Sequence, residues 1–394
     1  VPFGIELGDW RLRMSLHHWV NDGLMALFFF VVGMELKREI LVGELADLRQ
    51  AALPICAAIG GMAAPALIYV ALNPSGAALR GWGIPMATDI AFAVGALVLL
   101  AARVPRALIT FLVALAIVDD LGAVLVIALF YTDALAMPWL ALAALLLGAL
   151  VVLNLGGIRR TVPYFVIAVL LWYALLQSGV HATLAGVLGA FTVPARPKYD
   201  PPLFSAHVRK LLARFDESNT RDANILTNDD LRTTVQTLGN GVLAVQTPLQ
   251  RLEHLWHLPV AFLVIPVFAL FNAGIPLRID ALATTLAHPV TLGITAGLVA
   301  GKFIGITGAS ALALWLGLAQ LPTGVRFAHI AAVSLLAGIG FTMSIFIAEL
   351  GFGNDPALLV MAKTGVLVAS ALGGLLGVAW LALLARGRHA AAAR

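Results

Sequence analysis

Two adjacent acids, Asp119 and Asp120, lie in the middle of the apolar run "VALAIVDDLGAVLV". Without them, the run would cross a membrane as an ordinary apolar helix. Each ionised acid at the bilayer centre costs about 2.5–3.5 kcal/mol even on lenient insertion scales. The pair therefore predicts a task that ordinary membrane anchoring does not explain.

Charge recurs at the same depth in two other apolar runs, as Asp89 in one and Lys302 in another. All four residues lie within about three residues of the midpoint of their run, so their depths agree to roughly 5 Å at the rise of an α-helix. A lone acid and a lone lysine would neutralise each other as a buried ion pair. Three acids and one base leave an excess of negative charge, which must be protonated, hydrated or bound to a cation. This set predicts a cation or proton pathway.

Asp119 and Asp120 cannot share one ligand in the way that residues four apart can. Neighbouring residues diverge by about 100° around an α-helix. We therefore expect different tasks for the two acids. One should face an aqueous cavity, and the other a neighbouring helix or Lys302.

Two of the apolar runs contain residues that interrupt helices. Pro85, Thr88 and Asp89 lie in "GWGIPMATDIAFAVG", and Gly338, Gly340 and Thr342 lie in "LLAGIGFTMSIF". A proline kink or a pair of glycines alone is common in membrane helices. Together, the two runs fit a pattern in which one interrupted helix from each half of the chain crosses near the midplane. Asp89 would then offset positive helix amino termini, and Lys302 negative carboxyl termini. Asp89 is accordingly predicted to be a structural and electrostatic partner rather than the principal ligand.

The composition indicates an integral membrane protein. Of 394 residues, 61% are hydrophobic and 12% are charged, the mean hydropathy is +0.95, and soluble proteins carry roughly 25% charged residues. The net charge of +4 is spread over short loops and does not indicate a nucleic-acid partner. The single cysteine, Cys56, excludes an intramolecular disulfide.

Eleven apolar runs approach the length that a membrane-spanning helix needs. They are 17–36, 52–73, 81–101, 107–130, 135–155, 163–178, 179–194, 257–276, 289–317, 328–350 and 356–386. We predict one membrane domain over 1–394, an all-α polytopic helix bundle. The charged stretch 195–256 is interpreted as a cytoplasmic loop within it, a solvated linker in preference to a regulatory segment.

The basic residues give the bundle an orientation. Loops after the odd-numbered runs carry Lys37, Arg38, Arg106, Arg159, Arg160 and Arg326, whereas the opposite loops carry Arg80 and Arg278, apart from Arg11 and Arg13 in the amino-terminal tail. Because cytoplasmic loops are enriched in Lys and Arg, the first run should end inside. The carboxyl terminus should then be cytoplasmic.

Six strings, in order along nearly the whole chain, resemble the NhaA family of sodium/proton antiporters. They are "NDGLMALFFFVVGMELKREI", "ATDIAFAVGAL", "VDDLGAV", "RLEHLWH", "GKFIGI" and "AGIGFTMSIFIAEL". The resemblance implies inverted repeats, two discontinuous helices and a multi-pass protein of the bacterial inner membrane. The family has a helix before the first string, so the eleven runs and that helix would make twelve.

The resemblance also assigns roles to residues. It implies Asp119 and Asp120 as the acids that bind the cation (Na⁺) and the proton, and Thr88, Asp89 and Lys302 as parts of the broken-helix assembly. It further implies pH sensing by Glu35, Arg38, Glu39, Glu253, His254 and His257 at the cytoplasmic end. The implied partners are membrane lipid and a second copy of the chain in a homodimer. No cofactor is expected, with Na⁺, Li⁺ and H⁺ as transported substrates.

The predicted activity is antiport by alternating access, and not an enzymatic reaction. Cations and protons would compete for Asp119 and Asp120, so activity should rise with pH, and displacement of two protons by one Na⁺ would make exchange electrogenic. An intramembrane aspartyl protease is an alternative, although its YD and GxGD motifs differ from "TDIAF" and "VDDLG". A cation channel is a second alternative, which predicts currents without proton countermovement.

Overall fold

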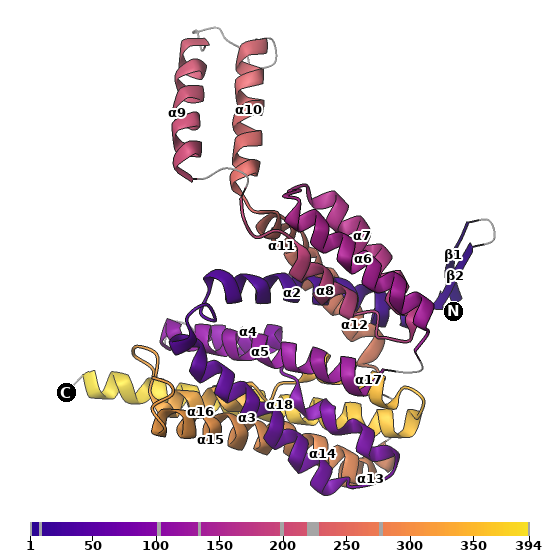
Figure 1. Ribbon diagram of the computed structural model, residues 1–394. Coiled ribbons are helices and arrows are strands. Elements are labelled where there is room, and N and C mark those ends of the chain that lie inside the picture. The colour runs from indigo at the N-terminus through magenta and orange to yellow at the C-terminus, as the bar shows by residue number, and fades with distance from the viewer. Residues whose placement is uncertain are drawn as a thin grey trace.

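The computed structural model describes residues 2–7, 10–100, 104–132, 135–197, 201–218, 228–275 and 279–392. Its long helices form one bundle, with α4, α5, α16 and α18 in one group and α6, α7, α8 and α11 in a second (Figure 1). By length and composition, eight described segments can cross a membrane, or nine with the bent pair α16 and α17. The all-α membrane fold is confirmed. The eleven spans and the inverted repeats stay predictions.

The elements before the charged stretch follow the predicted runs closely. They are β1 (Pro2–Leu7), β2 (Trp10–Ser15), α1 (Leu16–His18), the π-helix η1 (Trp19–Leu24), α2 (Met25–Val42), α3 (Leu48–Leu72), the 3₁₀-helix η2 (Ala77–Met86), α4 (Ile90–Val98), α5 (Arg106–Phe130), α6 (Met137–Leu155), α7 (Thr161–Ser178) and α8 (Leu184–Thr192). At nine residues, α8 rises only about 13.5 Å, so the run 179–194 contributes one short helix.

The remaining elements are all helical. They are α9 (Pro201–Ser218), α10 (Asp229–Val245), α11 (Pro248–Pro259), the π-helix η3 (Val260–Val264), α12 (Ile265–Asn272), α13 (Ile279–Ala287), α14 (Pro289–Ala296), the π-helix η4 (Gly297–Gly301), α15 (Lys302–Trp315), α16 (Phe327–Leu336), α17 (Phe341–Phe352) and α18 (Pro356–Ala392). Arg278, which was counted in the charge bias, lies outside the described residues.

The amino-terminal tail adds a small sheet to the helical fold. Strands β1 and β2 pair antiparallel, with Pro2 opposite Ser15 and Leu7 opposite Trp10. The segment "WRLRMS" alternates apolar and polar residues, which is the period of a strand. This hairpin lies beside the start of the first helices (Figure 1).

The stretch 195–256 contains more structure than a linker. Helices α9 and α10 stand side by side as a hairpin that projects from the bundle (Figure 1). The next helix begins at Pro248, nine residues before the predicted run 257–276, because Thr247 and Gln250 form a capping box at its start. The predicted start of that run was therefore wrong. Glu253, His254 and His257 lie on a helix continuous with it.

Both runs with helix-interrupting residues depart from regular α-helix. In the first, η2 ends at Met86 and α4 begins at Ile90, with Asp89 in extended conformation between them. In the second, α16 ends at Leu336 and α17 begins at Phe341, and the two helices are bent by 50°. We call the two non-helical segments, 87–89 and 337–340, the first and second break.

Small residues bring the helices around the breaks close together. A Cβ on Gly305 of α15 would lie 2.1 Å from the carbonyl oxygen of Gly60 of α3, so only glycine permits this crossing. A Cβ on Gly338, in the second break, would lie 2.4 Å from the carbonyl oxygen of Leu298 in η4. These approaches hold the helix that carries Lys302 against both α3 and the second break.

Candidate cation and proton site

The two breaks touch each other through their backbones. The amide of Asp89 donates to the carbonyl of Ile339 at 2.7 Å, and the hydroxyl of Thr88 lies 2.9 Å from the carbonyl of Ala337. Ser344 of α17 donates to the carbonyl of Ile84 in η2 at 2.8 Å. Backbone groups freed by one break thus find partners at the other, as burial in lipid requires.

Asp89 caps two helices at once. One carboxylate oxygen accepts from the amide of Phe92 in its own helix α4 at 3.2 Å. The other accepts from the amide and the hydroxyl of Thr342, at the start of α17, at 3.0 and 2.5 Å. A carboxylate is favoured beside helix amino termini, where amides are unpaired and the helix dipole is positive. Its oxygens are thus engaged in holding the breaks together.

Asp119 is the partner of Lys302. The ammonium nitrogen of Lys302 lies 2.5 Å from Oδ2 of Asp119, and the Lys302 side chain is fully buried. The hydroxyl of Thr88 reaches the same oxygen at 2.7 Å. Because that hydroxyl has one hydrogen, it serves either Asp119 or Ala337 at a given moment. The expected use of Lys302 against helix carboxyl termini is not seen in the described hydrogen bonds, in which its ammonium donates to Asp119.

Asp120 is buried without partners. It is 1% exposed, and neither of its carboxylate oxygens has a hydrogen-bond partner among the described residues. Oδ1 of Asp119 is likewise unpartnered. Buried polar atoms are normally satisfied, so three unpaired oxygens on adjacent acids can accept a proton or a cation. Asp119, Asp89 and Glu35 add negative potential at Asp120, and Lys302 opposes it.

The structure thus brings together most of the residues predicted near the midplane. We call Thr88, Asp89, Asp119, Asp120, Lys302 and Thr342 the acidic site. Gly338 and Gly340 form part of the second break and make its close packing against η4 possible. Lys302 begins α15 directly after the π-helix η4, an irregularity that is common at functional sites.

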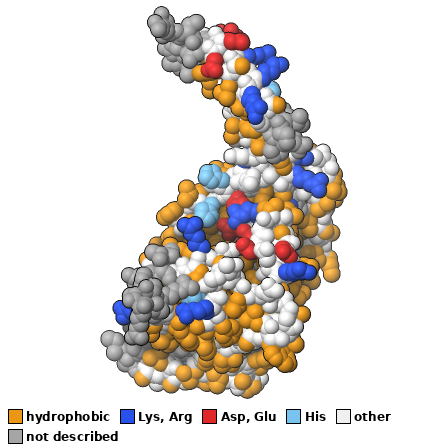
Figure 2. Space-filling view, turned by 90° about the vertical axis from the view of Figure 1, so that its left-hand side faces the viewer, with side chains coloured by type: hydrophobic (Ala, Val, Ile, Leu, Met, Phe, Trp, Pro, Cys, Tyr) orange, Lys and Arg blue, Asp and Glu red, His pale blue; other side chains and the backbone are white. Residues whose placement is uncertain are grey.

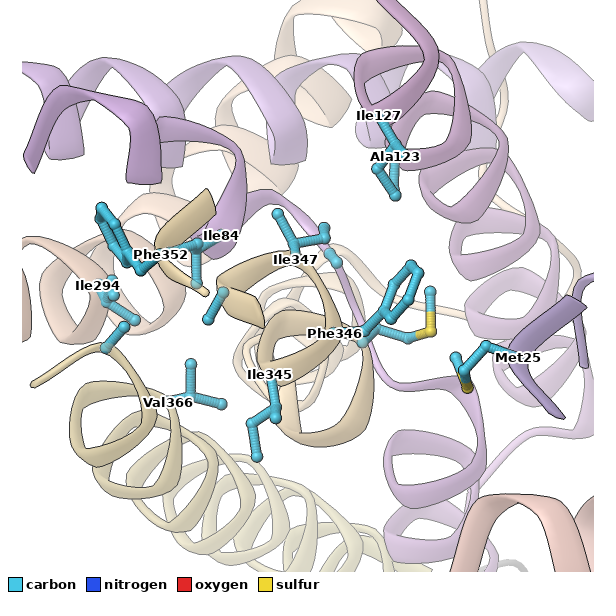
Figure 3. Packing of buried hydrophobic residues seen from close by; sticks show 14 of the residues in the cluster. Met25, Ile84, Ala123, Ile127, Ile294, Ile345, Phe346, Ile347, Phe352 and Val366 are labelled. Carbon is cyan, nitrogen blue, oxygen red and sulfur yellow. The ribbon is translucent and has the colours of Figure 1, made fainter. Parts of the chain in front are cut away.

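An apolar layer lies on one side of the acidic site. Ala123 and Ile127 follow Asp120 on the same face of α5, one and two turns further along. They belong to a buried cluster with Met25 and Phe346 (Figure 3). Phe346 also packs against Phe29, with ring centroids 5.6 Å apart.

Beyond this layer is a polar cavity of about 830 Å³, lined in part by His17, Arg80, Tyr131 and Glu349. We call this side of the bundle the His17 end. The positive-inside bias predicts that this end faces the outside of the cell. The apolar layer separates the cavity from the acidic site.

The opposite side, which we call the Arg38 end, holds the residues implied in pH sensing. Arg38 pairs with Glu253, and its second nitrogen lies 3.3 Å from Glu39. His257 lies 3.4 Å from Glu35. His254 is exposed on α11 and outside this set of contacts. Acidic, basic and His side chains gather on this face of the molecule (Figure 2).

Two residues make structural contacts that the sequence pattern does not predict. Lys37 donates to the carbonyls of Phe191 and Val193 at 2.6 and 2.5 Å and so caps the end of α8. Ser344 joins the second half of one broken run to the first half of the other. Its signal, a hydroxyl two residues after Thr342, is too common in membrane helices to be read alone.

The described residues hold no cluster of three or more His, Cys, Asp or Glu side chains able to bind a metal ion. The unpaired oxygens of the acidic site come from two acids, and one of these is already paired with an ammonium group. Such a site suits an ion that binds reversibly in competition with protons.

Comparison with known proteins defines the class. The family model described as Na+/H+ antiporter 1 matches residues 1–381, and the chain belongs to this family. The family consists of transporters, so the protease alternative falls away.

Individual relatives agree over almost the whole chain. The Na(+)/H(+) antiporter NhaA 1 of Saccharophagus degradans is 58% identical over 381 residues, which cover 97% of this chain and 82% of that protein. The Na(+)/H(+) antiporter NhaA of Acidithiobacillus ferrooxidans is 53% identical over 386 residues, covering 97% and 88%. That of Sulfurimonas denitrificans is 50% identical, covering 97% and 86%.

Proposed function

We propose that this protein exports Na⁺, or Li⁺, from the cytoplasm in exchange for external protons, electrogenically and with activity that rises with pH. Its place is the bacterial inner membrane, with the carboxyl terminus in the cytoplasm. The observation that carries the proposal is the buried, unpartnered carboxylate of Asp120 beside the half-satisfied carboxylate of Asp119. Membership of a Na⁺/H⁺ antiporter family supports Na⁺ and H⁺ as the two ions that are exchanged.

The two acids divide the work. Protonated, Asp120 is neutral and tolerates its apolar surroundings; deprotonated, it offers two oxygens to a hard cation, which prefers oxygen ligands. Alkaline conditions remove the competing proton, so cation binding strengthens as pH rises. The free Oδ1 of Asp119 and the hydroxyl of Thr88 are further oxygens within the same site.

Lys302 supplies the second exchangeable charge. A cation that engages both acids weakens the contact between Asp119 and the Lys302 ammonium, which is fully buried and costly to leave unpaired. Na⁺ binding would release one proton from Asp120 and one from the pair of Asp119 and Lys302. One Na⁺ would then be exchanged for two protons. Each cycle then moves net charge, and the membrane potential can drive Na⁺ outward.

The test of the function is transport in everted membrane vesicles with a pH-sensitive dye. Addition of Na⁺ or Li⁺ to acidified vesicles should release the quenched fluorescence, more at alkaline than at neutral pH, and K⁺ should not. Proteoliposomes with an imposed potential then test electrogenicity, since the rate should change with the potential. Ion currents without proton movement would contradict antiport and indicate a channel.

Two further parts of the proposal concern regulation and assembly. The Arg38 end would sense cytoplasmic pH through its ion pairs, which include the imidazole of His257. The homodimer implied by the resemblance is tested by light scattering of the detergent-solubilised protein. A mass of one chain per particle would contradict it.

A further inference from the structure

A second set of buried charges lies at the His17 end, apart from the acidic site. Glu349 of α17 pairs with Lys363 of α18, with 2.5 Å between Nζ and Oε1, and both side chains are 8% exposed. The other oxygen of Glu349 lies 3.6 Å from Nε2 of His17. One carboxylate thus stands between an ammonium group and an imidazole.

His17 connects this carboxylate to water. Its side chain is 41% exposed, and it lines the cavity of about 830 Å³ together with Glu349. Its Nδ1 lies 3.4 Å from the amide nitrogen of Asn21, whose amide oxygen accepts from Asn272 of α12 at 2.8 Å. Both asparagines are neutral, and the ionisable group that acts most strongly on the imidazole is Glu349.

The remaining charged or titratable groups of the cavity lie around this set. They are His18, Asp22, Arg80, Tyr131, His181 and Asp355. Asp22 interacts electrostatically with all three histidines. The ionisable groups that act most strongly on Glu349 itself are His17 and Lys363.

The position of Glu349 links the cavity to the acidic site. Glu349 follows Thr342 by seven residues on α17, two turns further and about 10 Å along the axis, on the same helix face. Thr342 bonds to Asp89 within the acidic site. Phe346 of the apolar layer lies between them on this helix. Glu349 is therefore the carboxylate on the far side of that layer.

The chemistry of the set suits proton transfer. When His17 gains a proton from the cavity, Glu349 faces two cationic groups. Once the 3.6 Å between Nε2 and Oε2 closes to hydrogen-bond distance, the N–H bond of the imidazolium can break as an O–H bond forms at Oε2, which leaves a neutral imidazole and an acid. Lys363 keeps its proton and holds the carboxyl group in place. A purely structural ion pair would need only Glu349 and Lys363, without a water-facing titratable neighbour.

We propose that His17 and Glu349, positioned by Lys363, form a proton relay at the His17 end, which loads protons before the apolar layer opens toward the acidic site. This inference rests on the proposed antiport. It adds a second proton-handling site on the side that faces outward.

The experiment compares His17→Gln with His18→Gln. His18 neighbours His17 and lines the same cavity, but it bonds to Ser15 and not to Glu349. Exchange is measured in right-side-out and in everted vesicles, while the bath pH is varied between about pH 5 and 8, the range in which imidazole titrates. Only one orientation exposes the His17 end to the bath.

The relay predicts that His17→Gln loses the dependence on bath pH in that orientation alone, whereas His18→Gln keeps it. A His17→Gln protein with unchanged dependence would overturn the proposal, as would equal losses in both variants. If the unmodified protein moves no protons on Na⁺ addition, the antiport itself fails instead.

A second pair of variants tests the carboxylate. Because Glu349→Gln leaves a buried ammonium group unpaired, the double variant Glu349→Gln with Lys363→Met removes both charges and preserves folding better. We expect it to exchange ions several-fold more slowly, and to match His17→Gln in its loss of dependence on bath pH. Wild-type dependence in a folded double variant would contradict a role for Glu349.

Discussion

The acidic site and the Arg38 end both contain several acids beside a base, yet water reaches them very differently. Lys302 and Asp119 form an ion pair with no side-chain exposure, whereas the Arg38 side chain is 41% exposed beside Glu253. Coulombic attraction is strong in a low-dielectric interior and weak at a wet surface. The same residue types therefore have large energetic consequences at one site and small ones at the other.

The comparison also separates two kinds of acid within the acidic site. Carboxylate oxygens of Asp89 and Asp119 accept hydrogen bonds from helix amides, hydroxyls and an ammonium group. Those of Asp120 accept none among the described residues. Asp89, in which both oxygens have partners, holds structure in place, whereas Asp119 keeps one oxygen free. An acid without partners can exchange one ligand for another.

The largest expected effect is that of Asp120→Asn. The variant removes the exchangeable charge and breaks no hydrogen bond among the described residues, so it should fold normally and lose Na⁺-dependent proton movement completely. Dye dequenching in everted vesicles measures the loss, and gel filtration of the purified protein checks folding. Near-normal exchange would remove Asp120 from the site.

Next comes Lys302→Met, which leaves Asp119 buried without its ammonium partner. Breaking a buried pair from one side costs about 3–5 kcal/mol, and we expect a clearly lower unfolding temperature together with lost exchange. The double variant Asp119→Asn with Lys302→Met should regain most of that stability without regaining exchange. Additive losses in the double variant would show that the two side chains do not interact.

A smaller effect is expected from Thr342→Val. It removes the hydroxyl that donates to Asp89 and keeps the backbone amide, so one of the bonds between the breaks remains. A hydrogen bond to a charged group contributes about 1.5–3 kcal/mol. Exchange should slow, and Thr342→Ser, which restores the hydroxyl, should recover it. Equal rates for the valine and serine variants would contradict the coupling of the breaks.

The smallest effect on stability is expected at the Arg38 end. Arg38→Gln breaks a partly exposed ion pair, which is worth about 0–1 kcal/mol, so the unfolding temperature should hardly change. If this end senses pH, the pH profile of exchange should shift while the maximal rate is kept. An unchanged profile would leave the cluster without a sensing role.

The sequence predicted that charged residues of separate apolar runs belong to one site, because a charge in an apolar run has few explanations. It also predicted that Asp119 and Asp120 point in different directions, which follows from helix geometry alone. It could not tell which acid meets Lys302, because that depends on how α15 packs against α5. Close approach at Gly305 and Gly338 holds the helix that carries Lys302 against α3 and the second break, and such contacts leave no trace in periodicity.

Other features escaped for different reasons. The α9 and α10 hairpin is polar, so the pattern of apolar runs predicts a loop there. Glu349 and Lys363 lie near the ends of their runs, where charge is inexpensive in general. Only the fold shows that these two meet as a buried pair.

The most direct test of the central claim is Na⁺ binding to the purified protein by isothermal titration calorimetry, in buffers that differ in ionisation enthalpy. We expect Na⁺ to bind to the unmodified protein with release of protons and more tightly as pH rises. We expect no detectable binding to Asp120→Asn. Unchanged Na⁺ affinity and proton release in that variant would contradict the assignment of Asp120 as the exchangeable site.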